Sequence, residues 1–498
     1  MTVVASTEMF EWLRANKPKV YGNFINGEWI ESSSGEVISI YNAADNSQLL
    51  SSFQSSEEED VNKAVEAAHQ AFKEWSQVPG PDRGAILYRF AELLETNLEE
   101  LAFMLSAEQG KPLAESKGEV MRAAKEARFC AGEAFRIEGS TLPGERANVW
   151  SSTIRKPIGV IAAIAPWNFP IVTPVRKIAP ALAYGCSVVY KPASVTPWTS
   201  VRLMELFKEA GVPSGVVNLV VGSGSKVGNP LVHHPLVKGI SFTGSTDLGI
   251  QINKVAAGRL AKTQLELGGK NPAVVLDYQD VKVVAKQIVS AAFACSGQRC
   301  TSISRVIVVK EKKEELTEAI LQETRKIKLG PAWEQDVSMG PLVNKGHLDT
   351  VFNYIQIGLE EGARIRHGGE ILKGEKYSKG AYLTPTVIDL VMPEMRIAKE
   401  EIFGPVLCIQ EVKDEKEALE VANNVEYGLA ASIFTNRLND AYNLADEMEA
   451  GMLHINHGTA SAAHMPFGGV KKSGSGAFSI GSSNIEFFTV LKAIYIEY

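Results

Sequence analysis

Cys300 is the cysteine whose surroundings best fit a catalytic nucleophile. It follows a glycine turn and the polar pair Gln298-Arg299, whereas a packing cysteine normally has apolar neighbours. A cysteine in such a setting can supply a thiolate that attacks an electrophilic carbon, although the segment taken alone is also compatible with a packing role. We interpret the other cysteines as packing residues: Cys130, Cys186, Cys295 and Cys408.

Two further side chains could assist such a nucleophile. Glu266 lies between two leucines, and apolar flanks raise the pKa of a carboxyl group toward the range that a general base needs. The alternative for Glu266 is an ion pair with Lys270 or a helix cap. Asn168 stands in the proline-bounded segment Pro166–Pro170, where its amide could donate to a developing oxyanion. The alternative for Asn168 is an ordinary turn residue.

Glycines and small polar residues follow several predicted strands, at the edge where parallel sheets bind ligands. Backbone N–H groups of such loops can approach a phosphate, and an acid followed by an aromatic residue could clamp a ribose and a flat ring. No complete GxGxxG fingerprint is present, so the glycine spacing alone does not identify the ligand. The candidate residues are Lys191, Ser194, Gly224, Gly228, Gly244, Ser245, Glu401 and Phe403.

Strands and helices alternate along the chain that carries these residues. Amphipathic helices are predicted over residues 59–75, 82–98 and 113–135. Continuous apolar strands, typical of a sheet covered on both faces, are predicted near 158–164, 187–190, 216–221, 240–243 and 273–276. This alternation predicts a doubly wound parallel α/β sheet. A second α/β series, a β-rich tail (487–498) and an early hairpin (21–29) with an Asn-Gly turn complete the prediction.

The composition excludes several classes of protein. The 498 residues carry a formal charge of -7 and no basic cluster, which argues against nucleic acid or a membrane surface as the main partner. The longest apolar run, residues 160–167, is too short to cross a bilayer, and the first twenty residues do not form a secretory signal. The scattered cysteines have no metal-ligand spacing, so we predict no metal site and a reducing, cytoplasmic location.

Seven motifs in order give these signals a common interpretation. PWNFP, KPAS, FTGS, LELGGK, GQRC, EEIFGP and PFGGVKKSG resemble the aldehyde dehydrogenase superfamily over nearly the whole chain. The resemblance implies a Rossmann-type cofactor domain (1–132 and 150–265), an α/β catalytic domain (266–470) and a small β oligomerisation segment (133–149 and 471–498). A homodimer or a tetramer of dimers follows, because apolar tail residues such as Phe487, Val490, Ile494 and Ile496 would otherwise leave an exposed edge strand.

The resemblance also implies a role for each candidate residue. Cys300 is then the nucleophile, Glu266 the general base and Asn168, with the Cys300 backbone N–H, the oxyanion site. The thiolate adds to an aldehyde, hydride leaves for the nicotinamide, and water activated by Glu266 hydrolyses the thioester. The cofactor contacts that the resemblance implies are Trp167, Lys191, Ser194, Gly224, Gly228, Gly244, Ser245, Glu401 and Phe403.

The cofactor choice depends on Ser194. NAD-preferring relatives often carry a glutamate at this position, where it binds the ribose 2′-hydroxyl and repels a 2′-phosphate. Here a small hydroxyl stands three residues after Lys191, which remains to attract a phosphate. We therefore predict that NADP is accepted, with NAD also possible.

Arg176 points to a substrate with an anionic tail. In semialdehyde dehydrogenases an arginine at this position grips the distal carboxylate, and a guanidinium suits a carboxylate or a sulfonate. Ser461 is a second candidate contact. Position 294, where succinate semialdehyde dehydrogenases carry another arginine, is Ala294, and the GQRCT segment is closer to the 2-oxoglutarate semialdehyde branch. The alternative for Arg176 is a surface arginine paired with a nearby acid.

The expected substrate is therefore 2-oxoglutarate semialdehyde or succinate semialdehyde, with a sulfonated aldehyde such as sulfolactaldehyde as an alternative. The C-terminal pattern departs from the family at Ala477-Phe478, where many relatives have Arg-Glu. Two rival functions are a CoA-acylating dehydrogenase and a non-catalytic binding protein. The carboxylate at Glu266 argues against the first, and the three intact catalytic positions argue against the second.

Overall fold

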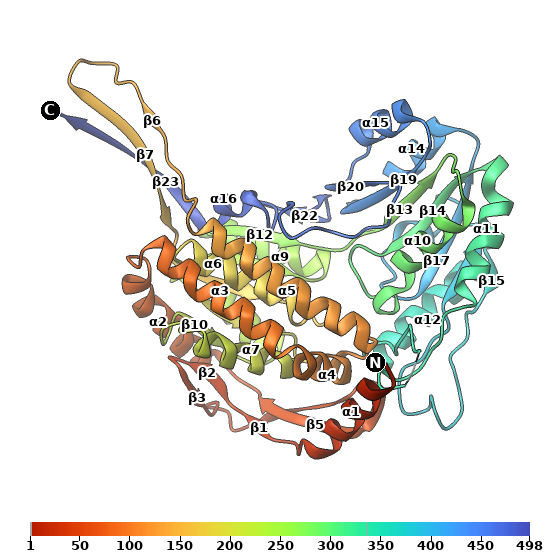
Figure 1. Ribbon diagram of the computed structural model, residues 1–498, viewed down its shortest axis with the longest axis horizontal. Helices are drawn as coiled ribbons and strands as arrows, with labels where there is room; N and C mark the ends of the chain where they lie inside the picture. Colours follow the sequence, from red (N-terminus) through yellow and green to blue (C-terminus); the bar gives the residue numbers. More distant parts are fainter. Residues whose placement is uncertain (1, 335) are drawn as a thin grey trace.

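The chain folds into two open α/β sheets that lie side by side, and a thin arm projects from one end (Figure 1). The computed structural model describes residues 2–334 and 336–498. Among these residues, no helix is both long and apolar enough to cross a membrane. The α/β fold class predicted from the alternation of strands and helices is confirmed.

The first sheet has eight strands, and its central strands are parallel, as predicted. Short antiparallel strands close both edges. The order along the sheet is β22 (Gly474–Ser475), β12 (Lys262–Glu266), β11 (Val237–Thr243), β8 (Val160–Ile164), β9 (Ser187–Lys191), β10 (Val217–Leu219), β2 (Asn23–Ile25) and β3 (Glu28–Ile30). The last two form the predicted hairpin, whose turn residues Asn26 and Gly27 both have positive φ.

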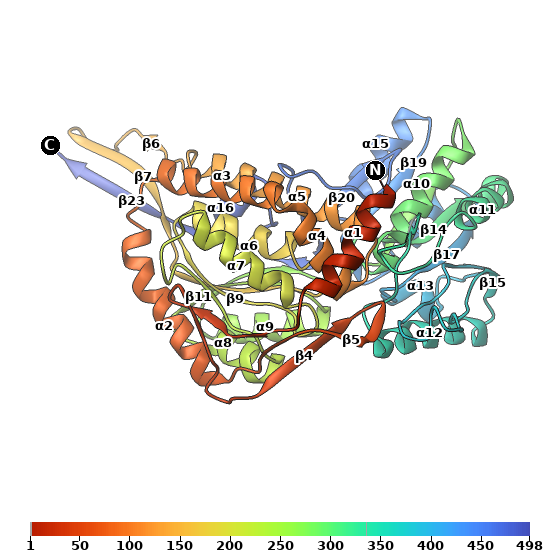
Figure 2. The same ribbon diagram turned by 60° about the horizontal axis from the view of Figure 1, so that its bottom comes forward.

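Both faces of this sheet are buried, which explains its continuous apolar strands. In β8, Ile161 and Ala163 pack into one hydrophobic cluster, whereas Val160 and Ala162 pack into another. Figure 2 shows the helices on opposite sides of the sheet. One side carries α3 (Gly80–Thr96), α4 (Leu98–Gln109), α5 (Leu113–Glu133), α6 (Val172–Ala183) and α7 (Trp198–Glu209). The other side carries α2 (Glu58–Trp75), α8 (Asn229–His233) and α9 (Thr246–Gly258).

The second sheet has seven strands and is parallel except for β15 at its edge. Its order is β15 (Arg364–His367), β16 (Thr386–Asp389), β17 (Val406–Val412), β14 (Ile303–Val309), β13 (Asn271–Val275), β19 (Ala430–Phe434) and β20 (Met452–Ile455). Its helices are α10 (Val281–Phe293), α11 (Lys310–Thr324), α12 (Lys345–Glu360), α14 (Glu415–Asn423) and α15 (Leu438–Glu447). The chain passes from the first sheet to the second between Glu266 and Asn271.

Smaller elements complete the molecule. The N-terminal helix α1 (Thr2–Ala15) precedes a three-stranded sheet of β1 (Val20–Tyr21), β5 (Asp45–Gln54) and β4 (Val37–Asn42). Two short strands, β18 (Tyr427–Gly428) and β21 (Val470–Lys471), pair with each other. Single-turn helices lie at α13 (Arg396–Lys399) and α16 (Ile485–Phe488).

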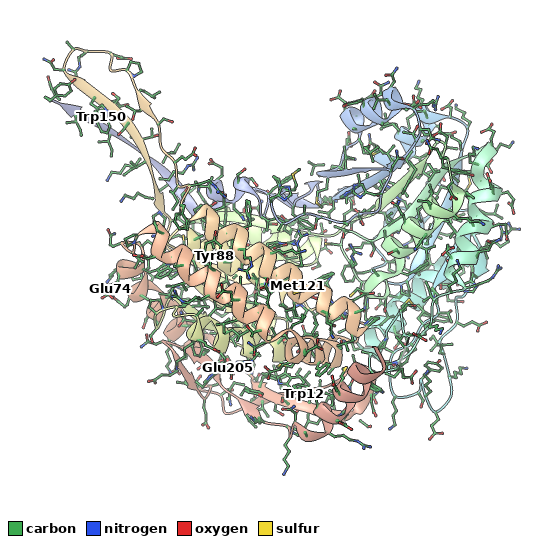
Figure 3. All side chains as sticks on the ribbon, viewed as in Figure 1. Trp12, Glu74, Tyr88, Met121, Trp150 and Glu205 are labelled. Atoms are coloured by element: carbon green, nitrogen blue, oxygen red, sulfur yellow. The ribbon has the colours of Figure 1, made fainter. Side chains whose placement is uncertain are left out.

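The arm is a three-stranded sheet in the order β23 (Thr489–Glu497), β7 (Val149–Pro157) and β6 (Thr141–Leu142). Strand β7 pairs with the tail along its whole length, so the arm includes residues 149–157, which the sequence prediction placed in the cofactor domain. Exposed apolar side chains lie along the arm, among them Trp150 (Figure 3) and Tyr495. Phe487, which we expected to be exposed in the tail, is buried in the main core instead.

Candidate active site

A cavity of about 530 Å³ lies where the two sheets meet, and it gathers residues that are far apart in the sequence. Its walls come from the ends of β8, β11 and β12 in the first sheet and from the loops before β14 and β17 in the second. The lining includes these predicted site residues: Trp167, Asn168, Arg176, Gly244, Ser245, Glu266, Cys300, Glu401, Phe403 and Ser461. α/β proteins commonly bind their ligands at the carboxyl ends of parallel strands, as here.

Cys300 stands in a loop with an unusual backbone, between α10 and β14. Cys295 and Ser296 adopt left-handed φ values of 54° and 55°, and Gly297 follows at 70°. A side chain at position 297 would lie 2.2 Å from the Gly404 carbonyl oxygen, so only glycine fits there. Burial, together with the charges of Glu401 and Glu266, raises the pKa of the Cys300 thiol to about 12. The thiol is therefore protonated in this state and needs a base.

Glu266 is the last residue of β12 and is almost fully buried. Burial raises the pKa of this carboxyl to about 7, although the positive charges of Lys177 and Arg176 oppose the rise. One carboxylate oxygen accepts a hydrogen bond from the Ser479 backbone N–H at 3.3 Å, and the other has no partner among the described residues. The expected alternative, an ion pair with Lys270, is not formed within the described part of the chain. A carboxylate with a free oxygen and this pKa is suited to accept a proton near neutral pH.

Asn168 follows β8 and is held from two sides. Its side-chain Nδ2 donates to the Gln298 carbonyl oxygen at 2.8 Å, which brings the amide beside the loop that carries Cys300. Its own carbonyl oxygen accepts from Lys111 Nζ at 2.7 Å. Lys111 is buried and ion-paired with Glu119, whose other oxygen accepts from the first N–H groups of α6. Because an amide nitrogen carries two hydrogens, one N–H of Asn168 remains for a ligand.

The residues expected to contact a cofactor fall into two groups. Trp167, Gly244, Ser245, Glu401 and Phe403 line the cavity, and the rings of Trp167 and Phe403 meet edge to face at 5.5 Å. Lys191, Ser194, Gly224 and Gly228 do not line this cavity but lie at the neighbouring strand ends. In this second group, Ser194 Oγ donates to the Gly222 carbonyl oxygen at 2.9 Å, and the backbone of Gly228 approaches the Lys191 side chain.

These residues fit a dinucleotide. The Lys191 ammonium is buried, which lowers its pKa to about 8, and it donates to the Pro192 carbonyl oxygen, so it retains N–H groups for ribose hydroxyls. A Cβ at Gly224 would meet no atom within 4 Å, so this loop has room beside it. Ser245 precedes the thirteen-residue helix α9, whose N-terminal N–H groups favour a phosphate. Glu401 accepts from the Gly269 N–H at 2.8 Å.

Arg176 lines the cavity and is paired with an acid, in a buried position rather than at the surface. Its Nε and Nη2 donate to the two carboxylate oxygens of Glu126 at 3.0 and 2.8 Å. Burial lowers the pKa of this guanidinium, but the charge and hydrogen bonds of Glu126 outweigh that effect and raise it overall. Its guanidinium also lies 4.4 Å from the centre of the Phe467 ring.

Two residues near Arg176 were missed by the sequence analysis. Arg122 lines the cavity, and both Arg122 and Glu126 belong to α5. Their spacing of four residues is visible in the sequence, but it is typical of any solvated helix face. Only the packing of α5 against α6 brings this face to the cavity. Ser461, the other expected substrate contact, also lines the cavity and bonds to Arg122.

Comparison with known proteins identifies the class. Residues 29–494 match the model of the aldehyde dehydrogenase family. An alpha-ketoglutaric semialdehyde dehydrogenase of Bacillus subtilis is 43% identical over 478 residues, which cover 96% of this chain and 98% of that protein. The chain therefore belongs to the aldehyde dehydrogenase family.

Solved structures agree with this assignment. The crystal structure of betaine aldehyde dehydrogenase from Staphylococcus aureus in complex with NAD+ superposes with a TM-score of 0.95 at 33% identity, covering 99% of this chain and 97% of that one. An NADP-dependent enzyme of Escherichia coli gives a TM-score of 0.93 at 36% identity, covering 96% and 98%. The predicted family, fold class and aldehyde-oxidising activity are thereby confirmed.

Proposed function

We propose that this enzyme oxidises a short aldehyde with a distal carboxylate, in the first place 2-oxoglutarate semialdehyde, to the carboxylic acid. The observation that carries the substrate class is that Arg176 opens into the same cavity as Cys300 and Glu266. The similarity to the Bacillus subtilis semialdehyde dehydrogenase supports the same substrate. NAD or NADP, when bound, supplies the hydride acceptor, in line with the two similar structures.

In this proposal Cys300 is the nucleophile and Glu266 is its base. The thiol has a pKa of about 12 and the carboxyl a pKa of about 7, so the proton must be taken up as the sulfur adds to the aldehyde carbon. The free N–H of Asn168 and the backbone N–H of Cys300 stabilise the oxyanion of the thiohemiacetal. Loss of hydride converts this adduct to a thioester on Cys300.

Glu266 also serves the second half of the reaction. Once the proton taken from Cys300 has been released to solvent, its unpartnered oxygen can accept a proton from a water molecule, which attacks the thioester and releases the acid and the Cys300 thiolate. This carboxylate favours hydrolysis over transfer to CoA, because a thiol acceptor does not need such a base. Acyl-CoA formation in an assay containing CoA would contradict this choice.

We propose that these residues contact successive parts of the cofactor. Lys191 and Glu401 would hold the ribose hydroxyls, Phe403 and Trp167 the nicotinamide side, and Gly244 with Ser245 the phosphates. Ser194, Gly224 and Gly228 would border the adenosine end. The small hydroxyl of Ser194 leaves space for a 2′-phosphate, so we propose that NADP is accepted and that NAD is an alternative.

The three structural parts are proposed to divide these tasks. The eight-stranded sheet binds the cofactor, the seven-stranded sheet carries Cys300, and the arm pairs with a second copy of the chain. The exposed apolar residues of the arm would be covered in a homodimer or a tetramer of dimers. A cytoplasmic location is proposed because all five cysteines are free.

A panel of aldehydes tests the proposed function. Matched five-carbon substrates, 2-oxoglutarate semialdehyde and pentanal, are assayed with NAD and with NADP, and formation of the reduced cofactor is followed. The proposal predicts a higher kcat/KM for the anionic aldehyde. Equal or higher efficiency with pentanal would refute the anionic substrate while leaving the aldehyde dehydrogenase chemistry in place.

A further inference from the structure

The side of the cavity beside α5 contains a compact cluster of two arginines around one carboxylate. Glu126 has a fully buried side chain and accepts from Arg176 and from Arg122, whose Nε lies 2.7 Å from Oε1. Both arginines line the cavity, with side chains 11% and 22% exposed for Arg176 and Arg122. Arg122 donates further to the carbonyl oxygen and hydroxyl of Ser461. The four residues are one hydrogen-bonded unit.

The second arginine, Arg122, gives this unit a net positive charge. Arg176 and Glu126 alone form a neutral pair, because a bidentate contact matches one positive charge with one negative charge. With Arg122 included, the unit carries one net positive charge in a largely buried position. Burying a charge without a counter-ion is unfavourable, so this arrangement is suited to bind an anion.

The cluster also has unused hydrogen-bond donors. Each guanidinium carries five N–H groups, and the contacts of Arg122 and Arg176 with Glu126 and Ser461 use about half of them. Ser461 Oγ lies 3.3 Å from Arg122 Nη2 and accepts from it, which leaves the hydroxyl hydrogen free to donate. A carboxylate that enters between these groups meets N–H and O–H donors on two sides.

Other charged groups of both signs also face the cavity. The carboxyl groups of Glu266 and Glu401 lie at the end where Cys300 stands. Arg299 also lines the cavity, and its Nη2 donates to Thr301 Oγ1 at 3.2 Å. An anionic tail is therefore favoured beside Arg122 and Arg176 rather than beside the two carboxyl groups.

We propose that Arg122 is a substrate-specificity residue, and that Arg122 and Arg176 together, with Glu126 as the bridge, bind the distal carboxylate. This inference rests on the proposed function and deepens it. Position 294, beside the cysteine loop, carries an arginine in succinate semialdehyde dehydrogenases but an alanine here. Arg122, on α5, supplies the second positive charge instead. Arg176 alone does not suffice, because Glu126 cancels its charge.

The Arg122→Met variant tests this inference. Methionine keeps an unbranched apolar stem, and Glu126 stays paired with Arg176, so the variant is expected to fold. The control is Arg128→Met, which removes an arginine of the same helix that pairs with Glu95 outside the cavity. We expect Arg122→Met to lower kcat/KM for 2-oxoglutarate semialdehyde by about tenfold or more. Its kcat/KM for pentanal and both values for Arg128→Met should stay within about twofold of wild type.

A compensating variant tests the charge count separately. Arg122→Met leaves the unit neutral, whereas Arg122→Met/Glu126→Gln returns it to one positive charge, now on Arg176. The double variant is expected to regain part of the preference for the anionic aldehyde. An unchanged preference in Arg122→Met, or no recovery in the double variant, would overturn the inference. If wild-type enzyme itself shows no preference for the anionic aldehyde, the proposed substrate fails, which is a different result from the failure of Arg122.

Discussion

The proposed role of Glu266 as general base predicts that the rate of this enzyme depends on pH near neutrality. Its carboxyl must be ionised to accept a proton, and burial raises its pKa from 4.5 to about 7. The ionised fraction of a group with that pKa rises from about one tenth at pH 6 to about nine tenths at pH 8. We therefore expect kcat/KM to rise about tenfold across this interval. A carboxyl with an ordinary pKa would be fully ionised throughout and would give a flat profile.

The direction follows from the charge state of the base. Raising the pH favours the ionised carboxylate, so activity is lost as the pH falls through about 7. Cys300 adds no second step in this range, because its pKa of about 12 lies far above it. Burial also raises the pKa of Glu401, which lines the same cavity, to about 7, so variants decide which carboxyl titrates. The assay is the initial rate of reduced cofactor formation at subsaturating aldehyde, measured between pH 5.5 and 8.5 as two matched buffer series.

Two variants identify the titrating group. Glu266→Gln is expected to be slow and to lose the rise between pH 6 and 8. Glu108→Gln is a matched control, because Glu108 is another buried carboxyl with a pKa raised to about 7 by burial, yet it caps α7 away from the cavity. That variant should keep the pH profile of the wild type. A profile that persists in Glu266→Gln would refute the assignment of the base.

Three further predictions follow from the same structure. Arg176→Ala should lower kcat/KM for an anionic aldehyde by roughly ten- to a hundredfold, the loss expected for a charge-assisted pair, while a neutral aldehyde of equal length is unaffected; an equal fall for both would refute the anion contact. Ser194→Glu should shift the ratio of kcat/KM values from NADP toward NAD, because a carboxylate repels a 2′-phosphate; undiminished NADP efficiency would contradict it. Deletion of the last ten residues, which removes β23, should dissociate the oligomer in sedimentation velocity or make the chain insoluble, and an unchanged oligomer would contradict the role of the arm.

Local patterns predicted most of the framework. The hairpin, the helices α2, α3 and α5, and the buried strands β8, β9 and β11 all carry strong periodicity or continuous apolar runs. Helix α4 received no prediction, because every residue from Leu101 to Gln109 is buried and this part of the helix has no solvated polar face. The pairing of β7 with β23 was not predicted for a different reason: it joins segments more than 300 residues apart, which local sequence does not encode.

The site was only partly accessible from the sequence. Cys300, Glu266 and Asn168 stand in distinctive segments, and the structure brings all three to one cavity. Their proposed roles are predictions that the variants test. Arg122 and Glu126 have no distinctive segment, since their contacts with Arg176 and Ser461 depend on how α5 packs. Arg176 was predicted as either an anion contact or a surface arginine paired with an acid. The structure shows a buried pair with Glu126 at the cavity, and the anion contact stays a prediction.

The central claim is that an aldehyde is oxidised through a covalent bond to Cys300, and one variant tests it most directly. Cys300→Ser is assayed with 2-oxoglutarate semialdehyde and either cofactor, beside Cys408→Ser, in which the hydroxyl can replace the contact of the buried thiol with the Ile397 carbonyl oxygen. The account predicts that Cys300→Ser loses at least about a thousandfold in kcat while Cys408→Ser remains active. Comparable turnover by Cys300→Ser and the wild type would contradict it.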